Sequence, residues 1–245
     1  SVACSLTPDE TVEIQKELLQ PNSSLSFGID SVEGYENFMP ARISNALGYI
    51  GSESTAVANP LFLERIPLEQ KLQKILSRKN VLKAMNVKYV TSGIPITDSD
   101  LSLVKSLQVG HCKNAVYLYE LHGVWPRYFV TNNVAQATST SDYGVVFDEL
   151  NLHQTPVVLF NSSVSIEKSP AKTFVTEAIP TLGERDMRFD HVTCTASCAF
   201  FVGNTFLDGW RAMVDGNPAP IYRVNYTYMA LVLEPGEHTI VLTYQ

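Results

Sequence analysis

Hydrophobic and polar residues follow two different repeats in the two parts of the chain. Between Leu68 and Met85, apolar residues recur at helical spacing with an interruption near Ser77, which predicts a helix that is broken there. Capping signals and the same spacing predict further helices at 8–20, 36–50 and 142–150. β-Branched and aromatic residues predict strands at 87–91, 116–121, 127–131 and 156–160. Helices and strands mixed in this way favour a small α/β layer.

Beyond about residue 172 the helical repeat disappears and a repeat of two replaces it. Apolar side chains alternate with other residues in 210–214 and again in 239–244, so each of these strands has two distinct faces. Asp215-Gly216 predicts a tight hairpin, because a primed turn needs the positive φ that Asp and Gly tolerate. Pro235-Gly236 marks the next reversal of the chain. Short strands at intervals of about 8–12 residues are typical of a β-sandwich.

These patterns predict an α+β protein with two parts. Residues 1–125 are expected to form a small α/β layer, and residues 126–245 an antiparallel β-sandwich of jelly-roll-like type. A chain of 245 residues, of which 45% are hydrophobic, is long enough for two such parts with a core in each.

Charge excludes a nucleic-acid partner, and hydropathy excludes a membrane-spanning helix within the printed sequence. The chain has 18 basic and 25 acidic residues, a formal net charge of −7 and no run rich in Lys or Arg, so nucleic acid is excluded as a partner. The printed sequence contains no stretch of about 18 consecutive apolar residues, the length a membrane-spanning helix requires. The first residue is Ser1, with neither Met nor a signal-type segment, so we expect a fragment or a processed product.

Four cysteines permit disulfides without requiring them. Cys194 and Cys198 flank three residues between two expected strands, a spacing that allows their Cα atoms to reach the separation of a disulfide. We expect no metal site, because this C-x3-C pair lacks two further ligands at zinc-site spacing and the five histidines are scattered. Cys4 and Cys112 are expected to be buried thiols, with a long-range bridge between them as the alternative.

Four segments, in order along the chain, resemble the YfhO-like family of bacterial membrane proteins. They are GYENFMPAR (Gly34–Arg42), LKAMNVKYV (Leu82–Val90), VYLYE with PRY (Val116–Tyr128), and GWRAMVDG with PGEH and a final Tyr (Gly209–Tyr244). That family is polytopic and similar to glycosyltransferases that use polyprenyl-phosphate sugars, and some members are associated with glycosylation of cell-envelope polymers. The resemblance implies that these residues are the large extracytoplasmic part, on the periplasmic or cell-surface side, tethered to the membrane domain of the parent protein.

The same resemblance implies a non-catalytic domain that assists glycosyl transfer. Its partners would be the membrane domain of the parent and a cell-envelope glycan or polyprenyl-linked sugar. The acidic first-loop motif that such transferases use is missing from the chain, so we expect no catalytic residue and no cofactor. Two alternatives remain open: a self-standing carbohydrate-binding or scaffold module, and a glycoside hydrolase whose acid pair the sequence does not reveal.

The candidate ligand-binding residues are Tyr35, Arg42, Trp210 and Asp215. Trp210 offers a flat face to a sugar ring, but its alternation also suits the sandwich core. Asp215 is a candidate for a sugar hydroxyl or a cation, although a turn role also explains it. Arg42, in one segment with Tyr35, lies at an expected helix start, where the dipole disfavours a cation; an internal salt bridge or a ligand anion must compensate it. Arg211, opposite Trp210 in alternation, is expected to be a solvated strand residue.

Overall fold

The computed structural model describes residues 9, 68–77, 79–109, 114–137, 157–160, 166, 175–183, 185–225 and 227–245. Apart from Asp9, which is helical, the helices expected at 8–20, 36–50 and 142–150 lie outside these residues. The chain divides into two compact units, and the described residues up to Val124 belong to the first and those from Trp125 onward to the second.

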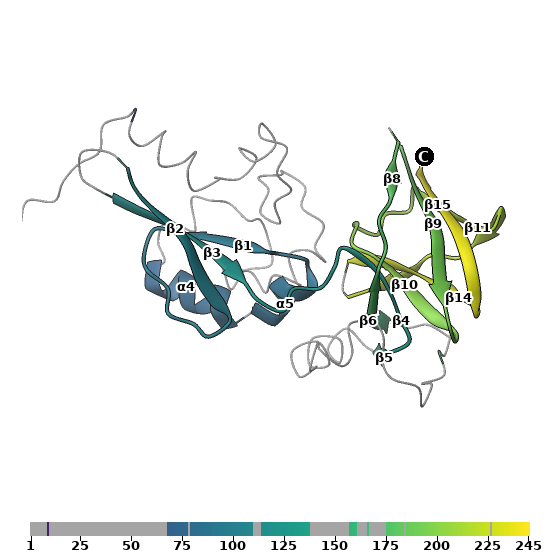
Figure 1. Ribbon diagram of the computed structural model, residues 1–245, viewed down its shortest axis with the longest axis horizontal. Coiled ribbons are helices and arrows are strands. Elements are labelled where there is room, and N and C mark those ends of the chain that lie inside the picture. The colour runs from purple at the N-terminus through teal and green to yellow at the C-terminus, as the bar shows by residue number, and fades with distance from the viewer. Residues whose placement is uncertain are drawn as a thin grey trace, which may run out of the picture. The chain divides into compact units, whose positions relative to one another are not determined.

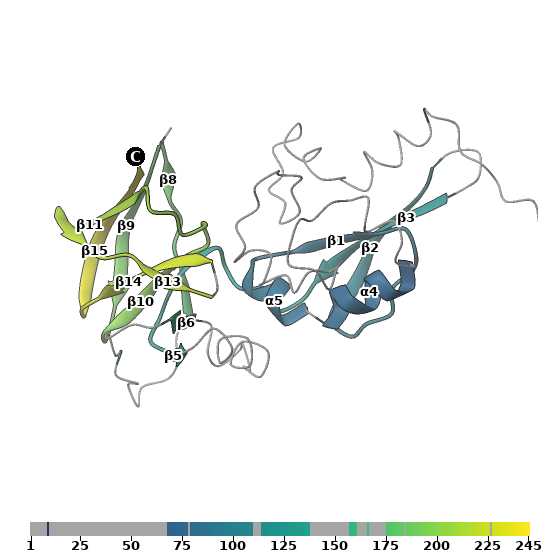
Figure 2. The ribbon, with the colours of Figure 1, turned by 180° about the vertical axis from the view of Figure 1, so that it is seen from behind.

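Two short helices and a three-stranded sheet make up the described part of the first unit. The helices α4 (Leu68–Ser77) and α5 (Lys79–Ala84) confirm the predicted helix with a break near Ser77. They lie along one side of the sheet (Figures 1 and 2). The strands are β1 (Tyr89–Ser92), β2 (Leu101–Val109) and β3 (Asn114–Leu121), in the order β1-β3-β2.

Ion pairs hold α5 against the turn that precedes β2. The Nζ of Lys79 lies 2.9 Å from Asp98 Oδ1 and 2.8 Å from Asp100 Oδ2, and Lys83 Nζ lies 3.2 Å from the same Asp100 oxygen. The hydrogen bond from Lys79 lowers the pKa of Asp100. Beside these pairs α5 buries the apolar side chain of Leu82, so the helix is fixed by packing and by charge.

The expected α/β layer in the N-terminal part is not supported. An α/β layer needs parallel strands joined by helices, whereas β3 pairs antiparallel with both β1 and β2 and the two helices precede the sheet. The sequence patterns missed β2, which forms a hairpin with β3 and makes the sheet antiparallel.

The second unit consists of two mostly antiparallel sheets, consistent with the predicted β-sandwich. The seven-stranded sheet has the order β5-β6-β13-β14-β10-β4-β7, and the five-stranded sheet the order β12-β11-β15-β9-β8. Only β5 and β6 are parallel among the pairs of described strands. The strands are β4 (Tyr128–Thr131), β5 (Val134–Ala137), β6 (Val157–Phe160), β7 (Val175–Glu177), β8 (Thr181–Leu182), β9 (Asp186–Cys194), β10 (Cys198–Val202), β11 (Trp210–Val214), β12 (Asn217–Ala219), β13 (Tyr222–Val224), β14 (Tyr228–Leu233) and β15 (Gly236–Tyr244).

The hydrophobic core lies between the two sheets. Phe189 of β9 meets Phe200 of β10 edge to face, with ring centroids 4.9 Å apart, and Ile240, Leu242 and Leu231 belong to the same cluster. Burying large aromatic and aliphatic side chains in this way supplies the main stabilisation of a sandwich. The chain passes between the sheets at β7–β8, β9–β10, β10–β11, β12–β13 and β14–β15. The last of these passages is at the reversal predicted from Pro235-Gly236.

Candidate functional site

The β11–β12 hairpin carries Trp210 and Asp215, two residues that the sequence singles out. The strands pair with Val214 opposite Asn217, which leaves Asp215 and Gly216 as a two-residue turn. The φ angles of these two residues are 52° and 79°, as a type I′ turn requires. The predicted hairpin is confirmed.

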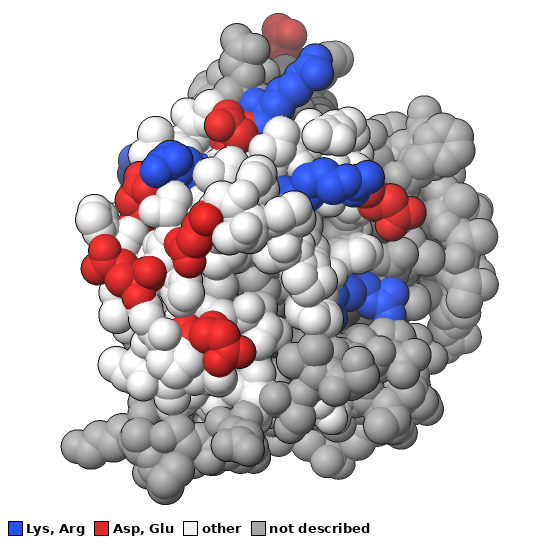
Figure 3. Space-filling view, turned by 90° about the vertical axis from the view of Figure 1, so that its right-hand side faces the viewer, with Lys and Arg blue, Asp and Glu red and all other residues white. Residues whose placement is uncertain are grey.

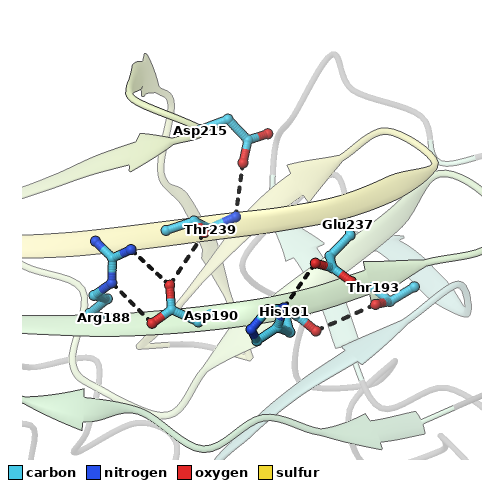
Figure 4. Close-up of polar contacts among 7 residues, drawn as sticks. All are labelled: Arg188, Asp190, His191, Thr193, Asp215, Glu237 and Thr239. Carbon is cyan, nitrogen blue, oxygen red and sulfur yellow. Dashed lines mark hydrogen bonds and ion pairs between the residues drawn. The ribbon is translucent and has the colours of Figure 1, made fainter.

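Asp215 fixes this turn to the neighbouring strand β15 (Figure 4). Its Oδ1 accepts a hydrogen bond of 2.8 Å from the backbone N–H of Thr239, and its Oδ2 lies 2.7 Å from Nδ1 of His238. The hydrogen bond with His238, followed by that from Thr239, lowers the pKa of Asp215. Both carboxylate oxygens of Asp215 therefore have hydrogen-bond partners within the protein. Holding the turn against β15 is a sufficient structural role for this residue.

His238 joins two turns at this end of the sheet. Its Nδ1 faces Asp215 and its Nε2 lies 2.9 Å from the carbonyl oxygen of Glu234. A neutral imidazole donates from one nitrogen only, so two acceptors favour the protonated ring. Burial opposes the charge most strongly, but the hydrogen bonds with Asp215 and with the Glu234 carbonyl outweigh it and raise the pKa of His238.

A β-bulge places a second polar cluster on the solvent side of β9 and β15. The register shifts so that Asp190 and His191 together oppose Thr239, and His191 takes a φ of 59°. Asp190 forms an ion pair of 2.8 Å with Arg188 and accepts a hydrogen bond of 3.3 Å from the Thr239 hydroxyl, while His191 Nδ1 lies 2.9 Å from Glu237 Oε1 (Figure 4). These groups pair with one another, so the cluster links the two strands.

A groove of about 530 Å³ lies beside the β11–β12 hairpin. Its walls come from the loop before β11, from both strands of the hairpin and from the residue before β13. Most of the lining is apolar and consists of Phe206, Leu207, Trp210, Met213, Pro218 and Ile221, together with two alanines. Two charged residues, Asp208 and Arg211, complete the lining that the described residues provide.

Trp210 serves both the core and the groove. Its half-buried indole packs against the core cluster and meets Tyr244 edge to face, with ring centroids 5.3 Å apart. The same side chain lines the groove. The core role expected for Trp210 is thus present in part, and the indole remains half-exposed beside the groove.

The side chain of Arg211 is held by hydrogen bonds to backbone carbonyls of neighbouring residues. Its Nη1 donates hydrogen bonds of 2.7 Å to the carbonyl of Asp208 and 2.9 Å to the carbonyl of Trp210. The residue is exposed, as expected from the alternation, but it also contributes to the groove. Charged side chains of both signs are interspersed on the face of the second unit that carries β11 and β15 (Figure 3).

Of the four candidate residues, the structure describes only Trp210 and Asp215. Trp210 lines the groove, whereas Asp215 lies in the turn and is absent from the described lining. Tyr35 and Arg42 lie outside the described residues. Sequence reasoning missed Asp208 as a site residue; the signal available was its place two positions before a tryptophan, in a loop that turns directly into a strand.

Cys194 and Cys198 form a disulfide, with their Cα atoms 6.1 Å apart. Cys194 ends β9 in the five-stranded sheet and Cys198 begins β10 in the seven-stranded sheet, so the bond joins the two sheets at one corner of the sandwich. Both residues are almost completely buried. Cys4 and Cys112 lie outside the described residues.

The described residues contain neither a metal-binding cluster nor a membrane-spanning helix. Within the described ranges, no group of three or more His, Cys, Asp or Glu side chains is arranged to hold a metal ion. None of the helices placed by the structure in those ranges combines the length and the apolar character needed to cross a membrane.

Comparison with known proteins gives little beyond this geometry. No protein-family model matches the chain, and no curated protein matches it. Among solved structures, the chain is similar to the cryo-electron-microscopy structure of the arabinofuranosyltransferase AftD from Mycobacteria, at 24% identity and a TM-score of 0.27. The match covers 31% of this chain and 6% of that one. The chain therefore spans only a small part of AftD, and a similarity this low assigns neither fold nor function.

Proposed function

We propose that this chain is a non-catalytic, extracytoplasmic domain that binds a glycan in the groove beside the β11–β12 hairpin. In the parent protein, a bacterial polytopic membrane protein, it holds a cell-envelope polymer or a polyprenyl-linked sugar for glycosyl transfer. The observation that carries the proposal is a groove that combines apolar walls with two charged residues.

Such a lining suits a sugar. Apolar and aromatic side chains pack against the C–H faces of a pyranose, and a few polar groups orient its hydroxyls. Trp210 and Met213 supply apolar surface, whereas Asp208 supplies a hydrogen-bond acceptor. A volume of about 530 Å³ falls within the range of small-molecule sites.

The hydrolase alternative makes a demand on the carboxyl groups of the groove. Glycoside hydrolysis uses a pair of carboxyl groups on either side of the scissile bond. Asp208 is the single carboxylate in the lining that the described residues supply, so the hydrolase alternative would need a second carboxyl group from beyond that lining.

The disulfide supports an extracytoplasmic location. Disulfides persist in oxidising compartments such as the periplasm and the cell surface, whereas cytosolic thiols are kept reduced. The buried Cys194–Cys198 bond is in keeping with such a compartment. Attachment to a membrane domain is supported by the sequence resemblance to the YfhO-like family, and hydrophobic spans of about 20 residues elsewhere in the parent gene would separate a tethered domain from a self-standing module.

A glycan array with the purified 245-residue chain, followed by calorimetry on the glycans that bind, tests the proposal. Leu207, which is 41% exposed in the groove wall, is replaced by Gln. The matched control is Ile179→Gln, at a residue that is 83% exposed and is not part of the groove lining. We expect Leu207→Gln to weaken binding by roughly tenfold, through loss of apolar contact, and the control to leave it unchanged. An array on which the folded chain binds no glycan would refute the proposal.

A further inference from the structure

We infer that the groove selects glycans that carry an anionic group, a carboxylate or a phosphate, and that Arg211 binds this group. The inference rests on the proposed function and adds to it the class of glycan and the residue that determines specificity. The two arginines in the strands of the five-stranded sheet differ in their partners: Arg188 pairs with a carboxylate, whereas Arg211 is bonded to backbone carbonyls.

Arg211 is anchored by backbone carbonyls and has no acidic partner among the described residues. Its Nη1 is anchored on the carbonyls of Asp208 and Trp210, which uses one edge of the guanidinium group. Among the residues that the structure describes, no carboxylate lies within ion-pair distance of Arg211. A guanidinium held in this way still presents its Nε and Nη2 donors, and it loses less side-chain entropy when a ligand binds than a freely rotating Arg does.

Arg188 shows what a paired arginine looks like on the same sheet. It lies in β9, two strands from β11, and its side chain is exposed like that of Arg211. Its Nη2 lies 2.8 Å from Asp190 Oδ1 and its Nε donates a hydrogen bond of 3.0 Å to Asp190 Oδ2. This fork-to-carboxylate geometry is the arrangement that Arg prefers. No described Asp or Glu pairs with Arg211 as Asp190 pairs with Arg188. Arg211 instead lines the groove.

The other residues of the groove indicate what kind of ligand would carry the anionic group. Met213, which shares a face of β11 with Arg211, lines the same groove, and an apolar surrounding strengthens a charge-assisted hydrogen bond. Asp208 lines the same groove and, as a carboxylate, accepts hydrogen bonds from hydroxyls. The matching ligand brings both an oxyanion and hydroxyl donors, as a uronic acid or a sugar phosphate does.

Matched ligand pairs test the inference with the full 245-residue chain. Oligogalacturonate is compared with its methyl ester, which keeps the rings and removes the charge, and galactose 1-phosphate is compared with galactose. We expect the charged member of at least one pair to bind roughly ten- to a hundredfold more tightly, the range of a charge-assisted hydrogen bond. The pair that shows this preference identifies the source as a uronate or a phosphate. Added salt should reduce the preference, because Arg211 is exposed.

The variants are Arg211→Gln and, as the matched control, Arg188→Gln. Arg211→Gln should remove the preference for the charged ligand and retain the affinity for the neutral one, with an unchanged unfolding midpoint; Arg188→Gln should retain the preference. Equal affinity for charged and neutral ligands in the unmodified protein, or a preference that survives Arg211→Gln, would overturn the inference and leave the proposed function standing. If neither these ligands nor any glycan on the array binds, both fail together.

Discussion

The two sheets of the second unit differ in how many of their faces are buried. In β10, an interior strand of the seven-stranded sheet, all five residues are buried, and the central strand β14 beside it has one half-buried residue. In β9 of the five-stranded sheet, buried residues alternate with exposed ones except at the bulge. A sheet buried on both faces has no surface for a ligand, whereas one with a free face does. The groove and both polar clusters accordingly involve the five-stranded sheet.

A second aromatic cluster lies on the other face of the seven-stranded sheet. Phe201, which points away from Phe200 along β10, stacks on Phe129 with ring centroids 4.7 Å apart and meets Tyr228 edge to face at 5.6 Å. Burial raises the pKa of Tyr228. Both faces of this sheet are therefore packed. The difference between the two sheets can be measured as the change in the free energy of unfolding when neighbouring residues of one strand are truncated.

The largest expected effect comes from truncating neighbouring residues in each sheet. Phe200→Ala and Phe201→Ala should each lower the free energy of unfolding by about 3–5 kcal/mol, because both side chains are buried on opposite faces of β10. In β9, Phe189→Ala should do the same, while Arg188→Ala should have little effect, since only one of these neighbours is buried. Urea unfolding of the four variants is the measurement. A small effect of Phe201→Ala would show that the outer face is not packed.

Removing the link between the sheets should have the next largest effect. Cys194→Ala with Cys198→Ala should lower the free energy of unfolding by about 2 kcal/mol, the lower end for a disulfide, because the bond closes a loop of sequence separation 4. The same loss is expected when the unmodified protein is reduced, which serves as the control. Unfolding curves that coincide with and without reductant would show that the bond contributes nothing.

At the edge of the five-stranded sheet, Gly216→Ala should destabilise by about 1 kcal/mol. An added Cβ meets nothing within 4 Å, so the whole cost comes from the φ of 79°. Gly203→Ala, after β10, should cost more, because its Cβ would lie 2.7 Å from the carbonyl oxygen of Arg127. Denaturation midpoints of the two variants are the measurement. A larger destabilisation by Gly216→Ala than by Gly203→Ala would mean that the backbone around Gly203 adjusts to the added Cβ more easily than the hairpin turn does.

The smallest expected effect is a pH dependence of the clamp between His238 and Asp215. The raised pKa of His238 stabilises the fold fully below the unfolded value of about 6.5, and this contribution is lost as pH rises through the folded pKa. The lowered pKa of Asp215 stabilises the fold above about 3.9, and this contribution is lost as pH falls through the folded pKa. The clamp is therefore strongest between about pH 4 and 6.5.

The difference in unfolding midpoint between the unmodified protein and Asp215→Asn, measured at several pH values, tests this prediction. The difference should be largest within that window. His191 also has a raised pKa, through its hydrogen bond with Glu237, so Glu237→Gln separates the two histidines. A midpoint difference that does not change with pH would exclude the clamp.

The features that follow local rules could be predicted from the sequence. Alternation gave the two faces of β11 and β15, and the Asp215-Gly216 pair gave the turn between β11 and β12. In strands, residues two apart share a face, which explains why Arg188 has Asp190 as a partner. Arg211 has Gly209 and Met213 at those positions, so its lack of a local acid was also visible in the sequence.

Features that depend on irregular or long-range geometry could not be predicted. β2 was missed because a register shift between Leu103 and Lys105 transfers the following residues to the opposite face, which breaks a simple alternation. His191 adopts a positive φ only because the partner strand is one residue shorter at that point. The groove lies within 206–221 and combines a loop, both strands of the hairpin and the residue before β13, which share no repeat.

The position of β15 constrains how the protein is made. This strand, Gly236–Tyr244, lies in the centre of the five-stranded sheet and pairs with both β9 and β11. During synthesis, β9 and β11 leave the ribosome with no neighbour between them, so this layer cannot assemble until the segment that ends at Tyr244 has emerged. A nascent chain that stalls before β15 is complete exposes apolar strand faces to chaperones and proteases, so formation of this layer depends on translation having passed Tyr244.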